Sequence, residues 1–352
     1  MKNITKTLLV LVSALSISFN ATAGDLAVSG SAKASYKIGG ATDSNSKGLG
    51  VSNELNFTAS GEMDNGFTWS YSTELDPADG GTATNDDSQL VIGMGDMGTV
   101  GIFDSEGGLS QELVYGIGAL GTGYDWGSTM TVEAGLDVSS HPNVQYHLPA
   151  DLLPFGLTAK VGYVPNMTDG QGNSFKNKGP VSPLTDDGNQ MTGYAITAKP
   201  IDGLTIGADY HETSGHLTTT KLEPSSGNAF AQYAAGNFKI GYSRGGYEPG
   251  LTAKNGVVTE YTNTSMGIEF AVNDQLSVSY NDEEFEAKKN VAIAAGAASN
   301  TKTTVTTEHE SIQVAYNMGG ATLGVALVEA KNDDYTAGKD TKMSIFTLAM
   351  EF

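Results

Sequence analysis

Large apolar residues and small polar residues alternate one by one along most of this chain. The stretch FTWSYSTELD at 67–76 places aromatic and aliphatic groups at one parity, and hydroxyl and carboxyl groups at the other. The same alternation recurs in DLAVSGSAKASYKI at 25–38 and in VSNELNFTASGE at 51–62. A period of two residues is typical of β-strands whose two faces meet different surroundings. The pattern therefore predicts an all-β protein.

The alternation predicts sixteen strands in all. They cover 25–38, 51–62, 66–76, 88–94, 98–104, 143–149, 155–164, 191–199, 204–212, 229–235, 238–244, 262–270, 276–282, 309–317, 321–329 and 341–352. The segments at 88–94 and 229–235 carry the weakest pattern.

The connections between these segments alternate between short and long. Even-numbered segments end in tight turns rich in Gly, Asn and Asp, such as EMDNG, GDMG and PIDG. Odd-numbered segments end in long polar stretches, at 77–87, 105–142, 165–190, 213–228, 245–261, 283–308 and 330–340. Such segregation predicts a 16-stranded antiparallel transmembrane up-and-down β-barrel with short periplasmic turns and long extracellular loops. A barrel of this size encloses a water-filled lumen.

Aromatic residues of the apolar parity gather at both ends of the predicted strands. Beside the short turns they are Phe67, Phe238, Phe270, Tyr316 and Phe352. Near the long loops they are Tyr36, Tyr163, Tyr210, Tyr242 and Tyr280. Two aromatic belts around an aliphatic band fit the two interfaces of a bilayer. The apolar flank of each strand is therefore expected to face lipid, and the polar flank to face solvent inside the barrel.

The first 23 residues have the layout of a cleaved secretory signal peptide. A basic start, MKNITK, precedes a short apolar run and an Ala-x-Ala ending at Ala23. Cleavage there leaves a barrel domain at 24–352, and loss of Lys2 and Lys6 takes the formal charge from −21 to −23. So acidic a chain is a poor partner for nucleic acid. Without cysteine it has no disulfide or thiolate chemistry, and without long apolar runs it is not a helical membrane protein.

With these features the whole mature chain resembles the general-diffusion porins of Gram-negative outer membranes. The resemblance is carried by DLAVSGSAKASY, NELNFTASGEMDNGFTWSYSTELD, LVIGMGDMGTVGIFDSEGGLS and the ending SIFTLAMEF. It implies an outer-membrane homotrimer in contact with lipid and lipopolysaccharide, and an inward-folded third loop at about 105–142. It also implies that terminal Phe352 is read by the outer-membrane assembly machinery. The chain departs from the family's arginine cluster, because Arg244 stands alone near a loop.

Motifs for catalysis and nucleotide binding lack their structural context. GMGDMG at 93–98 and GIGALG at 116–121 match G-x-G-x-x-G, but neither opens a helix after a strand. GYSRG at 241–245 matches a nucleophile elbow, yet a loop is expected after it and no His or acidic partner of Ser243 is evident. The five histidines show no helical metal-site spacing.

Several acidic stretches raise the question of whether the chain binds Ca²⁺. Weakly bound Ca²⁺ is an alternative to solvated charge in the acidic stretches, and solvated charge is the favoured interpretation. The stretches are Asp86–Asp87, Asp186–Asp187, Asp282–Glu283–Glu284 and Asp333–Asp334. No other cofactor or metal is expected.

The alternate positions that are expected to face the lumen include the charges that a passing solute would meet. The cations are Lys33, Lys37, Lys160 and Lys239. The wall anions are Glu54, Glu62, Glu74, Asp76, Asp209 and Glu269. The third loop adds Glu106, Glu112, Asp125, Glu133 and Asp137 with no Lys or Arg. An acidic narrow point favours cations, so we expect a non-enzymatic, cation-preferring diffusion channel. The alternatives are a substrate-specific channel of the same fold, a secreted soluble β-protein, and an outer-membrane enzyme.

Overall fold

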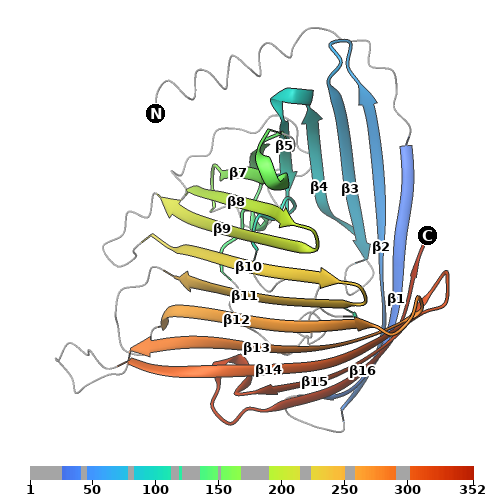
Figure 1. The fold of residues 1–352 in the computed structure, drawn as a ribbon, viewed down its shortest axis with the longest axis vertical. Helices are drawn as coiled ribbons and strands as arrows, with labels where there is room; N and C mark the ends of the chain where they lie inside the picture. The colour runs from blue at the N-terminus through green and yellow to red at the C-terminus, as the bar shows by residue number, and fades with distance from the viewer. Residues whose placement is uncertain are drawn as a thin grey trace.

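The computed structural model describes residues 26–40, 46–77, 83–111, 119–120, 135–149, 152–167, 190–214, 223–249, 258–290 and 302–352. The predicted signal peptide at 1–23 lies outside these residues. The described strands form one closed barrel of sixteen members, each paired antiparallel with its neighbours in the sequence. Figure 1 shows the strands following one another in chain order. The predicted fold class is confirmed.

The strands keep the order and number that the alternation predicts for the described part of the chain. Their bounds are β1 Leu26–Gly40, β2 Lys47–Glu62, β3 Thr68–Pro77, β4 Ala83–Gly93, β5 Thr99–Asp104, β6 Asn143–His147, β7 Thr158–Val164, β8 Gln190–Ile201, β9 Leu204–Ser214, β10 Ser225–Ala235, β11 Phe238–Glu248, β12 Val258–Ala271, β13 Leu276–Asn290, β14 Lys302–Asn317, β15 Thr322–Lys331 and β16 Thr341–Glu351. Short 3₁₀ turns lie between some of them: η1 Gly95–Met97, η3 Val138–Ser140, η4 Pro154–Gly156 and η5 Asp333–Tyr335. No helix among the described residues is long and apolar enough to cross a membrane.

The barrel closes where its first and last strands meet. Ser31 pairs with Glu351, and the register continues to Gly40 and Lys342. Beyond β16, the backbone N–H of Phe352 donates to the carbonyl of Gly30 at 2.9 Å, and the N–H of Gly30 donates to the carbonyl of Phe352 at 2.7 Å. Closure removes the two free strand edges, which a bilayer does not tolerate.

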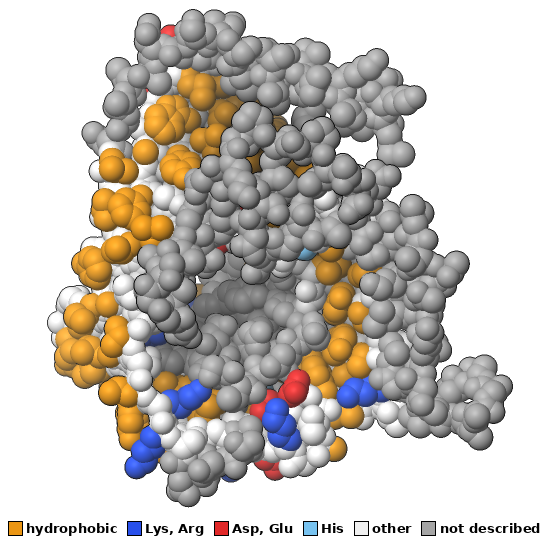
Figure 2. All heavy atoms as spheres, turned by 180° about the vertical axis from the view of Figure 1, so that it is seen from behind, with side chains coloured by type: hydrophobic (Ala, Val, Ile, Leu, Met, Phe, Trp, Pro, Cys, Tyr) orange, Lys and Arg blue, Asp and Glu red, His pale blue; other side chains and the backbone are white. Residues whose placement is uncertain are grey.

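The two faces of the wall differ as the alternation predicts. Large apolar side chains remain exposed on the outer face, among them Tyr71, Ile196, Tyr242, Ile268 and Phe346. Hydrophobic side chains gather along the left-hand flank of the molecule in Figure 2. Outer aromatics also meet across strands, since the ring centroids of Phe238 and Phe270 are 4.6 Å apart. Contact between so large an apolar surface and water is unfavourable, whereas contact with lipid chains is favourable.

Several strands extend further toward the long loops than the alternation predicts. β13 ends at Asn290 rather than near 282, and β14 begins at Lys302 rather than near 309. On the outer face of β13, Tyr280 is followed by Asp282, Glu284 and Glu286. The outer face is therefore polar there, while Phe285 and Ala287 are apolar and buried on the inner face, so the pattern of apolar outer residues ends although the strand continues. Glu283 and Glu284 of the acidic run, predicted as the start of a loop, therefore lie within a strand.

One strand begins later than predicted. β7 starts at Thr158, whereas the sequence pattern places its start at 155. Phe155 lies instead in η4, with φ of 62°, between Pro154 and Gly156. Proline removes a backbone donor and glycine favours turns, so the segment 152–157 forms a turn before the ladder begins.

Candidate functional site

The segment after β5 folds into the barrel, and a carboxylate holds its two ends together. Asp137 accepts hydrogen bonds from the backbone N–H groups of Leu109 at 2.9 Å and Ser110 at 3.0 Å. The same side chain accepts from the N–H of Ser139 and caps η3. Residues 109–110 and 137–139 are thereby fixed side by side. We call the described residues 105–111, 119–120 and 135–142 the constriction loop.

The base of the constriction loop packs into a notch on the inner wall. Leu109 and Val138 are fully buried. Glycines form the notch, because Gly162 of β7 lies directly opposite Gly193 of β8. A Cβ at Gly162 would lie 3.1 Å from Leu109, and one at Gly193 would lie 2.9 Å from Val138. Only a wall without side chains at these two points lets the loop lie so close.

A buried polar cluster fixes the next part of the loop. The N–H of Gln111 donates to a carboxylate oxygen of Asp209 on β9 at 2.5 Å. Asn228 donates to the other oxygen at 3.3 Å, and His211 Nδ1 lies 3.2 Å from it. His211 Nε2 also lies 3.7 Å from Asp137. Asp209 lies on the inner face, but its carboxylate is buried and binds the loop instead of lining an open wall.

The far part of the loop reaches the opposite wall. The N–H of Ala119 donates to Ser279 Oγ on β13 at 2.8 Å, and the N–H of Leu120 donates to Gln313 Oε1 on β14 at 2.7 Å. The described parts of the constriction loop therefore contact the inner wall both at β7–β9 and at β13–β14. This confirms the inward fold that the family resemblance implies.

Among the described residues, the inner wall is most exposed on β1 and β2. Many inward-facing polar side chains on β8–β14 are buried, among them Thr213, Asn228, Ser243, Asn281 and Ser311. On β1 and β2, inward-facing positions remain exposed or half-exposed. Two hollows follow this open wall, about 390 Å³ beside Lys33 and Glu54 and about 350 Å³ beside Lys33 and Lys37.

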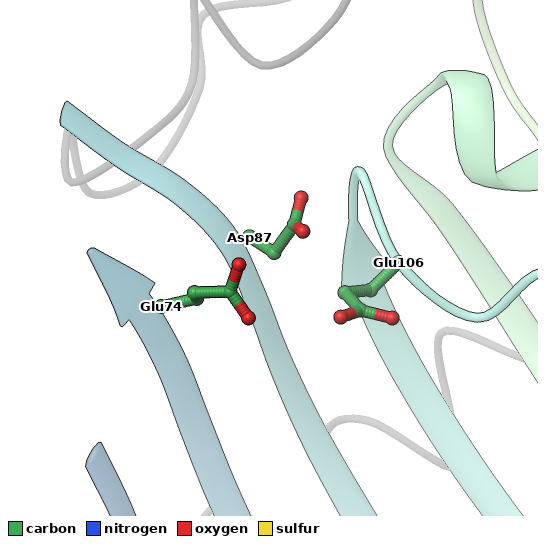
Figure 3. Close-up of side chains that lie close together, drawn as sticks. All are labelled: Glu74, Asp87 and Glu106. Carbon is green, nitrogen blue, oxygen red and sulfur yellow. The ribbon is translucent and has the colours of Figure 1, made fainter. Parts of the chain in front are cut away.

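Three carboxylates converge where the open wall meets the start of the loop. Glu74 of β3, Asp87 of β4 and Glu106 of the constriction loop each offer an oxygen, and these atoms all lie within 4.8 Å of one another. Figure 3 shows the three side chains together. We call them the acidic cluster. Each is half-buried, and among the described residues they form the one such group of three. Hard cations favour oxygen ligands of this kind.

The remaining predicted lumen charges lie in different settings. Lys33 and Lys37 are on the inner face of β1, because Lys37 lies opposite the inward-facing Ile345. Glu54 accepts from Asn56 at 2.8 Å. Lys160 is exposed beside His147, its partner in the β6–β7 ladder. Lys239 forms an ion pair with Glu269 at 2.9 Å. Asp76 lies on β3 opposite Thr84. Glu112, Asp125 and Glu133 lie outside the described residues.

Sequence reasoning missed several inner residues. The sequence pattern places Asp87 in a loop, because the predicted strand begins at 88, whereas β4 begins at Ala83. His309 Nδ1 lies 3.1 Å from a carboxylate oxygen of Glu283, and both side chains are buried. Near the long loops, Tyr247 stacks on Tyr261 with centroids 5.9 Å apart, and Tyr335 lies 5.4 Å from Tyr261. If the predicted strands had extended to 248 and back to 258, the alternation would have placed Tyr247 and Tyr261 on the inner face.

The catalytic and nucleotide motifs do not adopt the geometry their chemistry requires. Ser243 is fully buried within β11, which continues to Glu248 without the strand-to-helix turn of a nucleophile elbow. GMGDMG forms the β4–β5 connection through η1 and leads directly into another strand. Most of GIGALG lies outside the described residues.

Comparison with known proteins gives one family. The family model for Gram-negative porins matches residues 7–291. No curated protein matches the chain significantly. Among solved structures, it is similar to a loop L8 deletion mutant of OmpT, an outer membrane protein of Vibrio cholerae. That similarity has a TM-score of 0.65 at 14% identity and covers 94% of this chain and 100% of the other.

Two further structures share the fold. A porin refined at 1.8 Å gives a TM-score of 0.61 at 12% identity, over 93% of this chain and 100% of the other. A mutant of Rh. blastica porin gives 0.58 at 11% identity, over the same shares. Together with the family model, the closed barrel, its apolar outer face and the loop across its lumen lead to one conclusion. The chain belongs to the Gram-negative porin family and is an outer-membrane channel protein.

Proposed function

We propose that the channel passes ions and small hydrophilic solutes by passive diffusion, prefers cations, and turns over no substrate. The observation that carries the preference is the acidic cluster of Glu74, Asp87 and Glu106, half-buried at the edge of the open wall. Charge at the narrow part of a water-filled pore counts most for selectivity. The low dielectric of the surrounding wall concentrates this field in the lumen.

The lysines of the lumen offset this field only in part. Lys239 lies 2.9 Å from Glu269, so the two charges nearly cancel at a distance. Lys33 and Lys37 face the open lumen from β1, where Glu54 lies on the neighbouring strand opposite Ser31. Glu112, Asp125 and Glu133 would add to the negative side if they face the lumen as their place in the loop predicts. The balance favours cations.

The test is a reversal potential across a planar bilayer under a salt gradient. Purified protein is reconstituted and the sign of the zero-current potential is read in KCl. A potential of the sign set by K⁺ flux supports the proposal. A clear anion preference contradicts the selectivity while leaving the channel itself intact, and the absence of any conductance contradicts the channel.

A second candidate is a channel with a binding site for one solute class. The group of Tyr247, Tyr261 and Tyr335 on the inner face favours it, because aromatic faces stack on the apolar faces of sugar rings and planar solutes. Saturable uptake of one solute, lost in Tyr247→Ala, would support this function. Uptake that rises linearly for every small solute would support simple diffusion.

The remaining proposals concern export and assembly. We propose cleavage after Ala23, a homotrimer in contact with lipopolysaccharide, and recognition of Phe352 by the assembly machinery. Phe352 is 70% exposed at the end of the barrel seam, which suits a signal that another protein reads. An intact mass that begins at Gly24 tests cleavage. Chemical crosslinking in the native membrane tests the trimer.

A further inference from the structure

The inner face of β15 and β16 carries an apolar patch, although it points into the lumen. Ala326, Val328, Ala330, Met343 and Ile345 are all buried there, with at most 3% of their surface exposed. An apolar patch facing an aqueous lumen is unfavourable unless something covers it. Leu120 of the constriction loop packs against this patch. The patch is therefore a built contact surface for the loop.

Gly324 makes room for this contact. A Cβ at this position would lie 2.8 Å from Leu120 Cδ1, and closer still to Thr347 Oγ1. At the same point the loop backbone is held by Ser279 Oγ, 2.8 Å from the N–H of Ala119, and by Gln313 Oε1, 2.7 Å from the N–H of Leu120. Two hydrogen bonds and one packed side chain thus hold two consecutive residues.

The strand register places this contact beside the open wall. Ser279 lies opposite Gln313, Gln313 opposite Ala326, and Ala326 opposite Ile345. Ile345 in turn lies opposite Lys37, at the edge of the hollow of about 350 Å³. One row of inward-facing positions thus runs from the point where the loop is held to the open lumen. If Leu120 left the patch, the lumen would widen toward β15 and β16.

From this geometry we propose that Leu120, Ser279, Gln313 and Gly324 form a latch that positions the far end of the constriction loop and so sets the width of the open lumen. The proposal rests on the diffusion function above. The latch is separate from the base of the loop, which Asp137 and Asp209 hold on the other wall. Opening the latch leaves the loop attached at its base. The consequence is a channel that moves between levels of conductance, rather than one that has lost its constriction permanently.

The first experiment removes the latch from each side. Leu120→Ala shortens the packed side chain, and Gly324→Val fills the space that Leu120 occupies. The matched controls are Leu327→Ala, on the lipid face of β15, and Gly320→Val, in a turn where a Cβ meets nothing within 4 Å. We expect both latch variants to lose a single steady conductance level in single-channel recordings and to admit larger neutral solutes in liposome swelling. The controls should keep wild-type behaviour.

The second experiment fixes the latch covalently and does not depend on conduction. The native chain has no cysteine, so Ala119→Cys with Ser279→Cys introduces the only pair. Ala119→Cys with Ser277→Cys, one inward-facing position further along β13, is the control pair. We expect the disulfide to form at 279 and not at 277. The oxidised channel should show fewer transitions between conductance levels than its reduced form.

Each outcome of these experiments decides one question. A disulfide at 279 that quiets the channel, together with unsteady conductance in Leu120→Ala, supports the latch. No disulfide at 279, or a Leu120→Ala channel identical to wild type, overturns it even if Gly324→Val fails to fold. A wild-type protein that does not conduct contradicts the diffusion function instead, while the disulfide result still reports on the position of the loop.

Discussion

Asp209 on β9 accepts a hydrogen bond at 2.5 Å from the backbone N–H of Gln111, which lies 98 positions earlier in the chain. The bond ties the constriction loop to a wall strand inside the barrel. The carboxylate is fully buried, and Asn228 donates to it at 3.3 Å. A buried acceptor shared by two donors is expensive to remove, because both donors then lack a partner. We therefore expect this carboxylate to affect permeation by holding the loop and not by attracting ions directly.

Asp209→Ala is therefore expected to loosen the base of the loop. Removal of the acceptor should destabilise the barrel by about 1–3 kcal/mol. Urea unfolding in detergent, followed by tryptophan fluorescence, measures the stability. Single-channel recording measures the conductance, which depends on the position of the loop. Asp209→Asn is the matched control, since its amide oxygen still accepts from Gln111. Equal conductance and stability in Asp209→Ala and wild type would contradict the anchoring role.

The acidic cluster should set the selectivity of the channel. At about 5 Å from a passing ion, each carboxylate contributes roughly 0.8 kcal/mol in the dielectric of water. We expect Glu74→Gln, Asp87→Asn and Glu106→Gln together to lower the cation preference severalfold, with the reversal potential moving toward zero. High salt should reduce the difference from wild type, because the field is screened.

A control for the acidic cluster is available on the outer face. Glu284→Gln removes one carboxylate from β13 beyond the apolar band and away from the lumen. It changes net charge as each single cluster substitution does. If Glu284→Gln shifts the reversal potential as much as Glu106→Gln, selectivity follows total charge and not the cluster.

The alternation was sufficient to predict the barrel but not the full length of its strands. The outer residues Trp69, Tyr71 and Leu75 contrast with inward Ser70 and Ser72, and that contrast identifies a strand within a bilayer. Beyond the bilayer the contrast ends. Glu283 faces inward and Glu284 outward, and further along β13 the apolar Phe285 and Ala287 face inward, so apolar residues no longer mark the outer face of the strand. Strand ends near the long loops were underestimated for this reason.

The alternation along each strand predicts which site residues face the lumen, but it does not predict which of them contact one another. Parity placed Glu74 and Lys239 on the inner face, and the resemblance placed Glu106 in an inward loop. The pairing of Lys239 with Glu269 depends on the register of β11 against β12, and the alternation along either strand alone does not report that register. The burial of Asp209 depends on a loop contact across 98 positions. No local pattern reports such a contact.

For the ion pair between Lys239 and Glu269 we expect the opposite effect, because loss of the lysine should raise the cation preference. Both side chains are partly exposed, at 28% and 20%, so the pair should contribute at most about 1 kcal/mol to stability. Lys239→Met alone leaves Glu269 without its counter-charge and should raise the cation preference. Lys239→Met with Glu269→Gln should restore wild-type selectivity, as measured by reversal potential. Failure of the double variant to restore it would show that these charges act separately on ions.

The seam between β1 and β16 should be the most sensitive point for assembly. A Cβ at Gly30 would lie 2.8 Å from the backbone carbonyl of Glu54 and 2.9 Å from the ring of Phe352. Gly30→Val must displace one of them, and overpacking of this kind costs about 1–3 kcal/mol. We expect less heat-modifiable, folded barrel on unheated gels and faster unfolding in urea. Gly48→Val on β2 is the control, because a Cβ there meets nothing within 4 Å. Equal yields of folded barrel from the two variants would show that the crowding at Gly30 is relieved without opening the seam.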